Sequence, residues 1–221
     1  MRWGQVRSLV WVVAFALTAV ASGAAQAGSP SVQQVRGNFD PPPVGADSAI
    51  VYGKALPPVG YVDFCGRGEA ECQYRGGRVE TLNITTENWD DLVQINRYVN
   101  TKIRPVSDME LYHKPDYWTY PVTAGDCEDY VLLKKKYLVD LGFNPDQLLI
   151  TVVLDENREG HAVLTIVTNK GDYELDNRRM EILRWDQTGY IYLKRQSQAV
   201  ANEWVSLQKA APQVIVSTKA N

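Results

Sequence analysis

The sequence predicts an α+β domain in which helices pack on an antiparallel sheet. Two segments, 87–103 and 126–141, carry apolar residues at the spacing of amphipathic helices. Most of the chain after them consists of short apolar runs separated by turn residues, which is typical of paired strands. Helices followed by a set of strands, rather than a regular alternation of the two, indicate an α+β fold.

The composition indicates an exported globular protein. The chain has 221 residues, 45% of them hydrophobic, and a formal net charge of −3 with no basic block, so we expect no nucleic-acid partner. Residues 1–27 have the pattern of a secretory signal peptide: a basic start, an apolar core and the cleavage motif Ala25-Gln26-Ala27. A membrane anchor is the alternative, but the apolar stretch is too short. We therefore expect cleavage after Ala27 and a bacterial periplasmic location.

The remainder of the chain is predicted to have three parts. Residues 28–59 are rich in proline, glycine and serine and are expected to form an extended N-terminal arm. Residues 60–208 are expected to form the folded domain, and residues 209–221 a loose polar tail. The chain has no internal repeat, and we expect a monomer.

The two helices have recognisable ends. The first is predicted over 87–103, with Thr86 as its N-cap. The second is predicted over 126–141 and ends before Gly142, a residue that favours helix termination. The polar, aromatic segment 104–125 is expected to be a loop that leads into the second helix.

The strands are predicted from short apolar runs. A hairpin turn is expected at Asn169-Lys170-Gly171-Asp172, because these residue types favour tight turns between strands. A short strand is also expected before the first helix. The predicted strands are 79–84, 148–154, 161–168, 173–176 and 190–195.

The three cysteines take their meaning from the oxidising compartment. Cys65 and Cys72 are seven residues apart in FCGRGEAEC, and we expect a disulfide between them. A metal site is the alternative, but no second pair of ligands lies nearby. Cys127 is then unpaired, which suggests a reactive thiol or an intermolecular bridge. It falls in the first turn of the second helix, where the backbone N–H groups and the helix dipole stabilise a thiolate, so Cys127 is the candidate nucleophile.

A cysteine nucleophile needs a base, and the base needs a group that orients it. Of the two histidines, we favour His161 over His113, because a strand holds a catalytic group more firmly than a loop. Asp176, at the end of the next strand, is the candidate orienting residue. A two-residue turn at Lys170–Gly171 would set Met180 opposite His161, so a bulge, a different turn or strand bending must bring Asp176 to it.

Three carboxylates surround the candidate nucleophile: Asp126, Glu128 and Asp129. Like charges raise the pKa of a thiol, and a helix dipole offers only about 0.3–1 kcal/mol at an exposed end. A bound cation would remove this conflict, and an all-oxygen ligand set suits Ca²⁺. The alternative is that Asp126 caps the helix and the others are first-turn acids that match the dipole. No EF-hand loop is present.

These motifs together resemble those of the bacterial transglutaminase-like cysteine proteinases of the LapG type. The resemblance covers about residues 60–197 and rests on the segments CGRGEAEC, DYWTYP, GDCEDY, HAVLTIV, YELDN and RW…YIYLKRQS. It implies a papain/transglutaminase-like α+β fold. It also implies Cys127 as nucleophile, His161 as general base and acid, and Asp176 as orienting residue.

The resemblance implies a periplasmic, calcium-dependent cysteine endopeptidase, with Asp126 and Glu128 as calcium ligands and Asp129 assisting. Family members of this type cut a large surface adhesin near a double-alanine site and so release biofilm cells. They are held in check by an inner-membrane receptor that senses cyclic di-GMP. Two alternatives stay open: a transglutaminase, in which an amine replaces water, and a non-catalytic calcium-binding module of the same fold.

The oxyanion of the acyl-transfer reaction also needs hydrogen-bond donors. The backbone N–H of Cys127 is the expected first donor. The sequence does not identify a second one, for which Tyr117 and Trp118 are the candidates.

Overall fold

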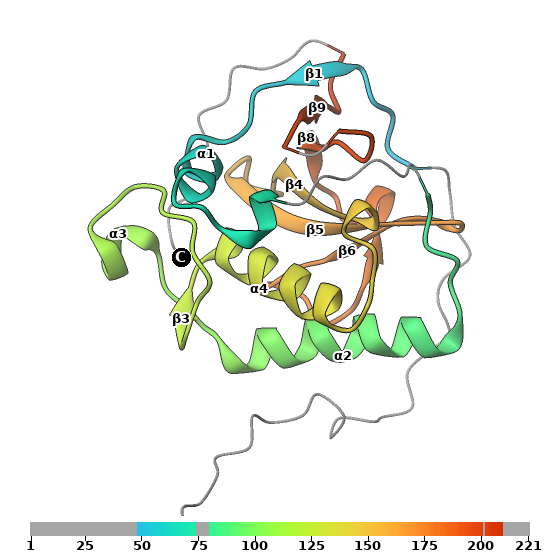
Figure 1. The fold of residues 1–221 in the computed structure, drawn as a ribbon, viewed down its shortest axis with the longest axis horizontal. Coiled ribbons are helices and arrows are strands. Elements are labelled where there is room, and N and C mark those ends of the chain that lie inside the picture. The colour runs from blue at the N-terminus through green and yellow to red at the C-terminus, as the bar shows by residue number, and fades with distance from the viewer. Residues whose placement is uncertain (1–47, 74–79, 201, 210–221) are drawn as a thin grey trace, which may run out of the picture. The chain divides into compact units, whose positions relative to one another are not determined.

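A seven-stranded antiparallel sheet forms the centre of the fold (Figure 1). The computed structural model describes residues 48–73, 80–200 and 202–209, all of which belong to one compact unit. The strand order is β1-β9-β8-β4-β5-β6-β7. The strands are β1 (Gly53–Ala55), β4 (Leu148–Leu154), β5 (Gly160–Thr168), β6 (Gly171–Leu175), β7 (Leu183–Arg184), β8 (Ile191–Gln196) and β9 (Trp204–Ser206).

Two long helices pack in succession on this sheet. Helix α4 (Cys127–Asp140) packs on β5, and α2 (Thr86–Lys102) packs on α4 (Figure 1). The apolar core joins all three, with Leu92 of α2, Leu132 of α4 and Leu164 of β5 almost fully buried. The predicted α+β class, with helices on an antiparallel sheet, is therefore confirmed. No helix within the described ranges has the length and apolar character needed to cross a membrane.

The predicted helices differ from the observed ones by one residue at each end. Helix α2 begins at Thr86, and its N-cap is Thr85 rather than Thr86: the Thr85 side chain accepts the Asn88 N–H, while the Asn88 side chain accepts the Thr85 N–H. Helix α4 begins at Cys127 and has Asp126 at its N-cap position. It ends just before Gly142, whose φ of +97° is the left-handed conformation that glycine adopts without strain.

The β5–β6 hairpin has a different turn from the predicted one. Thr168 pairs with Gly171, so the two-residue turn is Asn169–Lys170 rather than Lys170–Gly171. This change of one residue shifts the register by two. If the observed register is continued toward the start of β5, position 178 rather than 180 falls opposite His161, and Asp176 moves closer to it.

Several elements were not predicted. The segment 104–125, expected as a loop, contains a two-residue parallel pairing of β2 (Arg104–Pro105) with β3 (Ala124–Gly125), and helix α3 (Asp108–Tyr112). Helix α1 (Val59–Gly66) replaces the expected non-helical chain, and β1 pairs with β9 at an edge of the sheet.

The remaining predictions for the ends of the chain are partly outside the described residues. Over 80–84 the expected strand is reduced to a single bridge between Leu82 and Thr168. The signal peptide 1–27, most of the arm 28–59 and the tail from 210 onward lie outside the described ranges.

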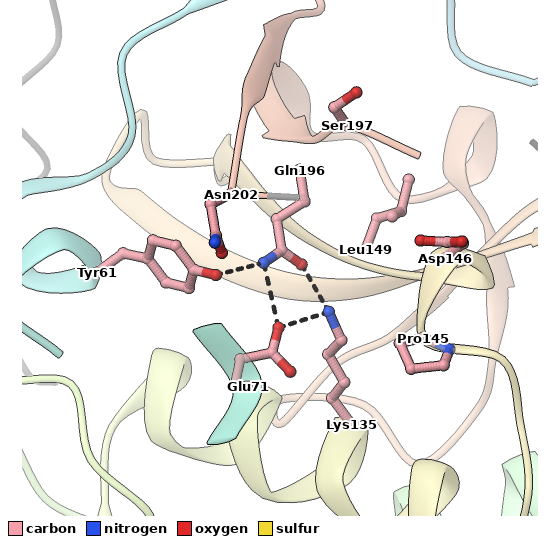
Figure 2. Close-up of a pocket in the computed structure, with 9 residues that line it drawn as sticks. All are labelled: Tyr61, Glu71, Lys135, Pro145, Asp146, Leu149, Gln196, Ser197 and Asn202. Carbon is pink, nitrogen blue, oxygen red and sulfur yellow. Dashed lines mark hydrogen bonds and ion pairs between the residues drawn. The ribbon is translucent and has the colours of Figure 1, made fainter. Parts of the chain in front are cut away.

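The predicted disulfide between Cys65 and Cys72 is confirmed, with the two Cα atoms 5.4 Å apart. Beside it, Glu71 forms an ion pair of 2.6 Å with Lys135 of α4. The Lys135 ammonium also donates to Gln196 of β8 at 2.8 Å, and the Gln196 amide donates to the Tyr61 hydroxyl of α1 at 2.9 Å (Figure 2). The polar groups of these side chains bond to one another, and in doing so they link α1, α4 and β8. The small cavity that they line therefore requires no ligand to complete their hydrogen bonds.

Replacing Lys135 tests this junction. The side chains of Lys135 and Glu71 are only 6% and 10% exposed, so Lys135→Met leaves a buried carboxylate without its cation. We expect the free energy of unfolding, measured by urea denaturation, to fall by about 3–5 kcal/mol. The double variant Lys135→Met/Glu71→Gln should recover part of that loss, because it removes both charges. A cost below about 1 kcal/mol for Lys135→Met would show that the pair behaves as an exposed one.

Candidate active site

Cys127 lies where β3 leads into α4, as the first residue of the helix. It is 7% exposed, and its thiol donates a hydrogen bond to Glu128 Oε2 at 3.0 Å. The first backbone N–H groups of a helix have no partner within the helix, so they point toward groups at this end. Cys127 therefore combines a sulfur atom at a pocket with backbone donors beside it.

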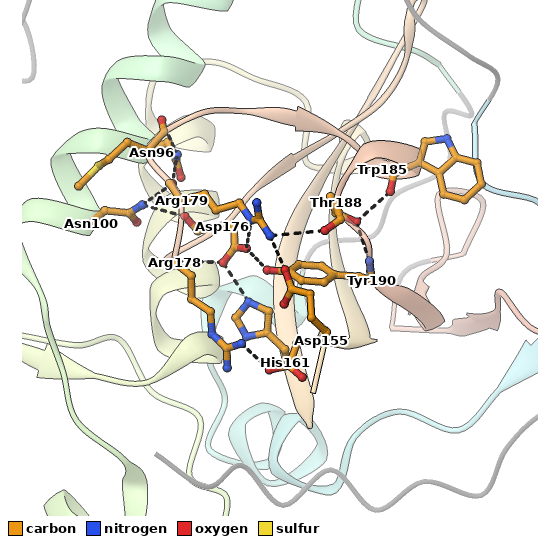
Figure 3. A network of polar contacts seen from close by, with 12 residues as sticks. Asn96, Asn100, Asp155, His161, Asp176, Arg178, Arg179, Trp185, Thr188 and Tyr190 are labelled. Atoms are coloured by element: carbon orange, nitrogen blue, oxygen red, sulfur yellow. Dashed lines mark hydrogen bonds and ion pairs between the residues drawn. The ribbon is translucent and has the colours of Figure 1, made fainter. Parts of the chain in front are cut away.

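His161 lies near the start of β5 and contacts Asp176, which follows the end of β6. His161 Nε2 and Asp176 Oδ1 are 2.9 Å apart, and the histidine is fully buried. Asp176 also accepts the Arg178 backbone N–H at 2.9 Å and the Tyr190 hydroxyl at 2.7 Å (Figure 3). The edge of the Tyr190 ring packs on the imidazole, with 5.6 Å between ring centroids. The shifted hairpin register thus brings the two predicted residues into contact.

The hydrogen bonds to Asp176 keep it charged. Burial alone would raise the pKa of this carboxyl group, but the hydrogen bond and the charge interaction with His161 hold it well below its usual range. The Arg178 N–H and the Tyr190 hydroxyl act in the same direction. Asp176 is therefore an ionised acceptor that can hold the imidazole in one orientation.

The other nitrogen of the imidazole has no partner among the described residues, and His161 lines a pocket together with Cys127. This nitrogen, His161 Nδ1, is buried. Because Nε2 donates to the carboxylate in the neutral ring, Nδ1 carries the lone pair that can accept a thiol proton. His113 is exposed and adopts a left-handed conformation after α3, away from these groups. The residues that line the pocket are Pro58, Asp116, Trp118, Cys127, Glu128, Val152, His161 and Ala162.

A cluster of carboxylates lies on the other side of Cys127. Oxygen atoms of Asp126, Glu128 and Asp108 lie within 4.8 Å of one another. Asp108, at the start of α3, was missed by sequence reasoning because it lies 18 residues before Asp126. The β2–β3 pairing brings the two segments together, and the Asp108 N–H donates to Asp126 Oδ2 at 3.2 Å. A two-residue parallel pairing leaves no pattern in the sequence that could have revealed this contact.

Asp129 is fully buried and lies outside this group of three. Its Oδ1 accepts the Thr119 backbone N–H at 2.8 Å, while its Oδ2 has no partner among the described residues. Gly125 makes room for it, because a Cβ at that position would lie 2.4 Å from Asp129 Oδ2. The glycine of the GDCEDY segment is thus required by the close approach of this buried carboxylate.

Burial and neighbouring negative charge oppose ionisation of these carboxylates, Asp129 included, and of the thiol. Burial, followed by the charge of Asp126, raises the pKa of Asp108 to about 7, and burial raises that of Asp129 to about 9. The pKa of Cys127 lies well above its usual value because of burial first and then the charges of Glu128 and Asp126. Without a compensating charge, the thiol is therefore held in its protonated form.

The three clustered residues fit a hard cation. Buried oxygen atoms of Asp108 and Asp126 have no hydrogen-bond partner in the described chain, and none of the three residues forms an ion pair there. All the available donors are carboxylate oxygens, the ligand type that Ca²⁺ prefers.

The two candidates for a second oxyanion donor are both engaged elsewhere or distant from the pocket. The indole N–H of Trp118 donates to Asp116 Oδ1 at 2.8 Å, although its side chain lines the pocket. Tyr117 does not line the pocket, and its backbone N–H donates to Asp108 Oδ2. The backbone N–H of Cys127 therefore remains the expected first oxyanion donor, and the structure supports neither Tyr117 nor Trp118 as the second donor.

Solved structures of LapG from Legionella pneumophila resemble this chain. One has 27% identity and a TM-score of 0.42, and the match covers 47% of this chain and 60% of that one, so this chain spans less than two thirds of its length. The calcium-bound form has 23% identity and a TM-score of 0.46 over 56% and 71% of the two chains. The EGTA-treated form has 26% identity and a TM-score of 0.43 over 50% and 66%.

No curated protein matches the chain. The sequence profile described as bacterial transglutaminase-like cysteine proteinase BTLCP, however, matches residues 51–212. This range includes every residue of the site described above. The chain therefore belongs to the family of bacterial transglutaminase-like cysteine proteinases.

Proposed function

We propose that the protein is a calcium-dependent cysteine endopeptidase in which Cys127, His161 and Asp176 form the catalytic triad. The observation that carries the proposal is the arrangement of the imidazole. Its Nε2 is hydrogen-bonded to Asp176, its Nδ1 has no partner among the described residues, and His161 lines the same pocket as Cys127. This order of nucleophile, base and orienting carboxylate is the one that thiol-dependent acyl transfer requires.

The reaction follows from these positions. His161 Nδ1 takes the thiol proton as the Cys127 sulfur bonds to the carbonyl carbon of the peptide, and the Cys127 backbone N–H stabilises the oxyanion. The same nitrogen gives the proton to the leaving amine as the C–N bond breaks, which leaves an acyl-enzyme. His161 then takes a proton from water, whose oxygen attacks the acyl carbon, and the C–S bond breaks to regenerate the thiol. Asp176 and Tyr190 hold the ring in place throughout.

Asp108, Asp126 and Glu128 are proposed to hold the calcium ion, with Asp129 as a nearby assisting charge. When bound, the ion would supply positive charge beside Cys127 and would compete for the Glu128 carboxylate, which otherwise accepts a hydrogen bond from the thiol. The raised pKa values of Asp108 and Glu128 support the proposal, since burial first and then the charge of Asp126 make their ionised forms unfavourable without a compensating charge.

The biological setting is proposed from the resemblance of the sequence to the LapG type. The substrate would be a large surface adhesin cut near a double-alanine site, and its cleavage would control attachment or biofilm. An inner-membrane cyclic di-GMP receptor would act as regulator. The pattern of residues 1–27 supports export to the periplasm.

The transglutaminase alternative uses the same triad and differs in the acyl acceptor. A labelled amine offered together with a glutamine-bearing protein separates the two reactions. Incorporation of the label without cleavage would favour the transferase.

Removing the nucleophile tests the catalytic proposal. Cys127→Ala should lower the rate of peptide-bond cleavage by at least about 10³-fold, because no other group can form the acyl-enzyme. The melting temperature, measured in the same calcium buffer, should stay within about 2 °C of the wild type, since only one sulfur atom is lost. Cleavage by Cys127→Ala at a rate near that of the wild type would disprove the triad. Cleavage by the wild type, together with its loss in Cys127→Ala, would also exclude a non-catalytic calcium-binding module.

Replacing single carboxylates tests the metal site. Asp108→Asn and Asp126→Asn should each weaken calcium binding, measured by isothermal titration calorimetry, by at least about tenfold, because each removes a charged ligand. Asp140→Asn is the matched control: Asp140 lies on the same helix, and its side chain is 56% exposed. Unchanged affinity in Asp108→Asn would remove that residue from the site.

The pH dependence of stability provides an independent test. The pKa values of Asp108 and Asp129 rise from 3.8 to about 7 and about 9 in the metal-free folded state, which therefore binds more protons than the unfolded state. Its stability should be greatest below pH 3.8 as far as these groups are concerned, and should fall as pH rises toward about 9. Calcium holds the same groups ionised, so the gain in melting temperature on adding calcium to chelated protein should grow from pH of about 5 to about 8. A gain that is constant over this range would contradict the assignment.

A further inference from the structure

Arg178 occupies an unusual position beside the triad. Its backbone N–H donates to Asp176 Oδ1 at 2.9 Å, and its guanidinium Nη1 donates to Asp155 Oδ2 at 2.5 Å. The Asp155 side chain is fully buried, and its other oxygen accepts two backbone N–H groups of the loop that precedes His161. Figure 3 shows the Arg178 side chain running past the His161 ring to reach Asp155. The ion pair thus joins the loop before the base to the turn after the orienting residue.

The guanidinium of Arg178 keeps most of its hydrogen-bonding capacity. A guanidinium has five N–H donors, and only one of them is used within the described chain. The Arg178 side chain is 42% exposed, although its partner Asp155 is buried. Arg179, the next residue, is engaged differently: it pairs with Glu156 and covers the Tyr190 ring. Arg178 is therefore an anchored cation with an open face.

The guanidinium of Arg178 lies beside the imidazole of His161 (Figure 3). Burial lowers the pKa of Arg178, while Asp155 first and then the negative charges of Cys127 and Asp176 raise it. The charged side chains that line the pocket itself, Asp116 and Glu128, are both acidic. An acidic group of a substrate would be repelled by those residues and attracted by the guanidinium of Arg178.

The chemistry of the triad decides which part of a substrate passes this side chain. His161 must deliver its proton to the leaving amine, so the residues after the scissile bond must run past the imidazole and its neighbours. Arg178 is held beside the imidazole by two separate contacts. The planar fork of a guanidinium matches a carboxylate in geometry as well as in charge.

We propose that Arg178 is a specificity-determining residue that binds an aspartate or glutamate side chain of the substrate within the first three residues after the scissile bond. The inference rests on the proposed endopeptidase function and names a recognition element of its substrates. A purely structural role as a brace for the His161 loop is the competing explanation.

Matched peptides separate the two explanations. The full chain, in calcium, is assayed with quenched fluorescent peptides that have an Ala-Ala centre and carry either Glu or Gln at the second or third residue after the scissile bond. The wild type should cleave the better Glu peptide with a kcat/KM about tenfold higher than its Gln counterpart, mainly through KM. In Arg178→Gln this ratio should fall to about one, and Arg178→Lys should restore part of it.

Two further variants keep the test decisive. Arg178→Gln/Asp155→Asn removes both charges, and so avoids a buried unpaired carboxylate if the single variant folds poorly. Arg158→Gln removes an exposed cation from the loop that precedes His161 and should leave the ratio unchanged. A wild type without preference for Glu, or a loss of kcat/KM in the double variant that is equal for both peptides, would overturn the inference while the endopeptidase function stands. Failure of the wild type to cleave any peptide or protein would overturn the proposed function itself.

Discussion

The burial of several carboxylates around one thiol is the constraint on which the site depends. Several other shielded acids in the described chain have a cation beside them: Glu71 pairs with Lys135, Asp155 with Arg178, and Asp172 with Arg195. Buried Glu174 instead accepts hydrogen bonds from the Thr165 hydroxyl, and its pKa is raised to about 8. The group formed by Asp108, Asp126 and Glu128 has none of these pairings. Charges removed from water without a partner are costly, so such a group must bind protons or a cation. The fold concentrates this requirement at the start of α4, beside Cys127.

The surroundings of Asp176 and Glu128 consequently shift the pKa values of these two carboxyl groups in opposite directions: that of Asp176 is lowered and that of Glu128 is raised. Asp176 receives hydrogen bonds from the imidazole, a backbone N–H and a tyrosine hydroxyl, and these keep it ionised. The pKa of Glu128 is raised by burial first and then by the charge of Asp126, and the hydrogen bond from the Cys127 thiol offsets this only in part. Asp176 is therefore stabilised as an anion by groups of the protein itself, whereas Glu128 is not. In the proposed mechanism, orientation of the base and activation of the thiol are consequently supplied by separate parts of the fold.

Local sequence patterns predicted the parts of the site that lie within single elements. The apolar spacing and Gly142 defined α4 to within one residue, and the apolar run of β4 was predicted over its observed bounds. Helix α1 was missed because the proline- and glycine-rich sequence around it favours extended chain, and packing against the core overrides that preference. The short helix in the aromatic segment before Cys127 was missed for a similar reason: this segment is held by hydrogen bonds to Asp126 and to Asp129 of α4, which no local pattern reveals.

Contacts between elements were predicted only where the chain order limits the choices. His161 and Asp176 lie on consecutive strands, so their proximity needed only a hairpin, and the prediction erred by one residue in the turn. Asp108 comes to Asp126 through two paired residues of β2 and β3, which no periodicity reveals. Asp129 differs from Asp108, because its place in the sequence beside Cys127 suggested that it assists the metal site. In the structure one of its carboxylate oxygens accepts the Thr119 N–H, and Gly125 lies against the other. The sequence of α4 therefore shows that several carboxylates lie at its first turn. Which of them lie close together depends on the segment 104–125, which folds back on this end of the helix.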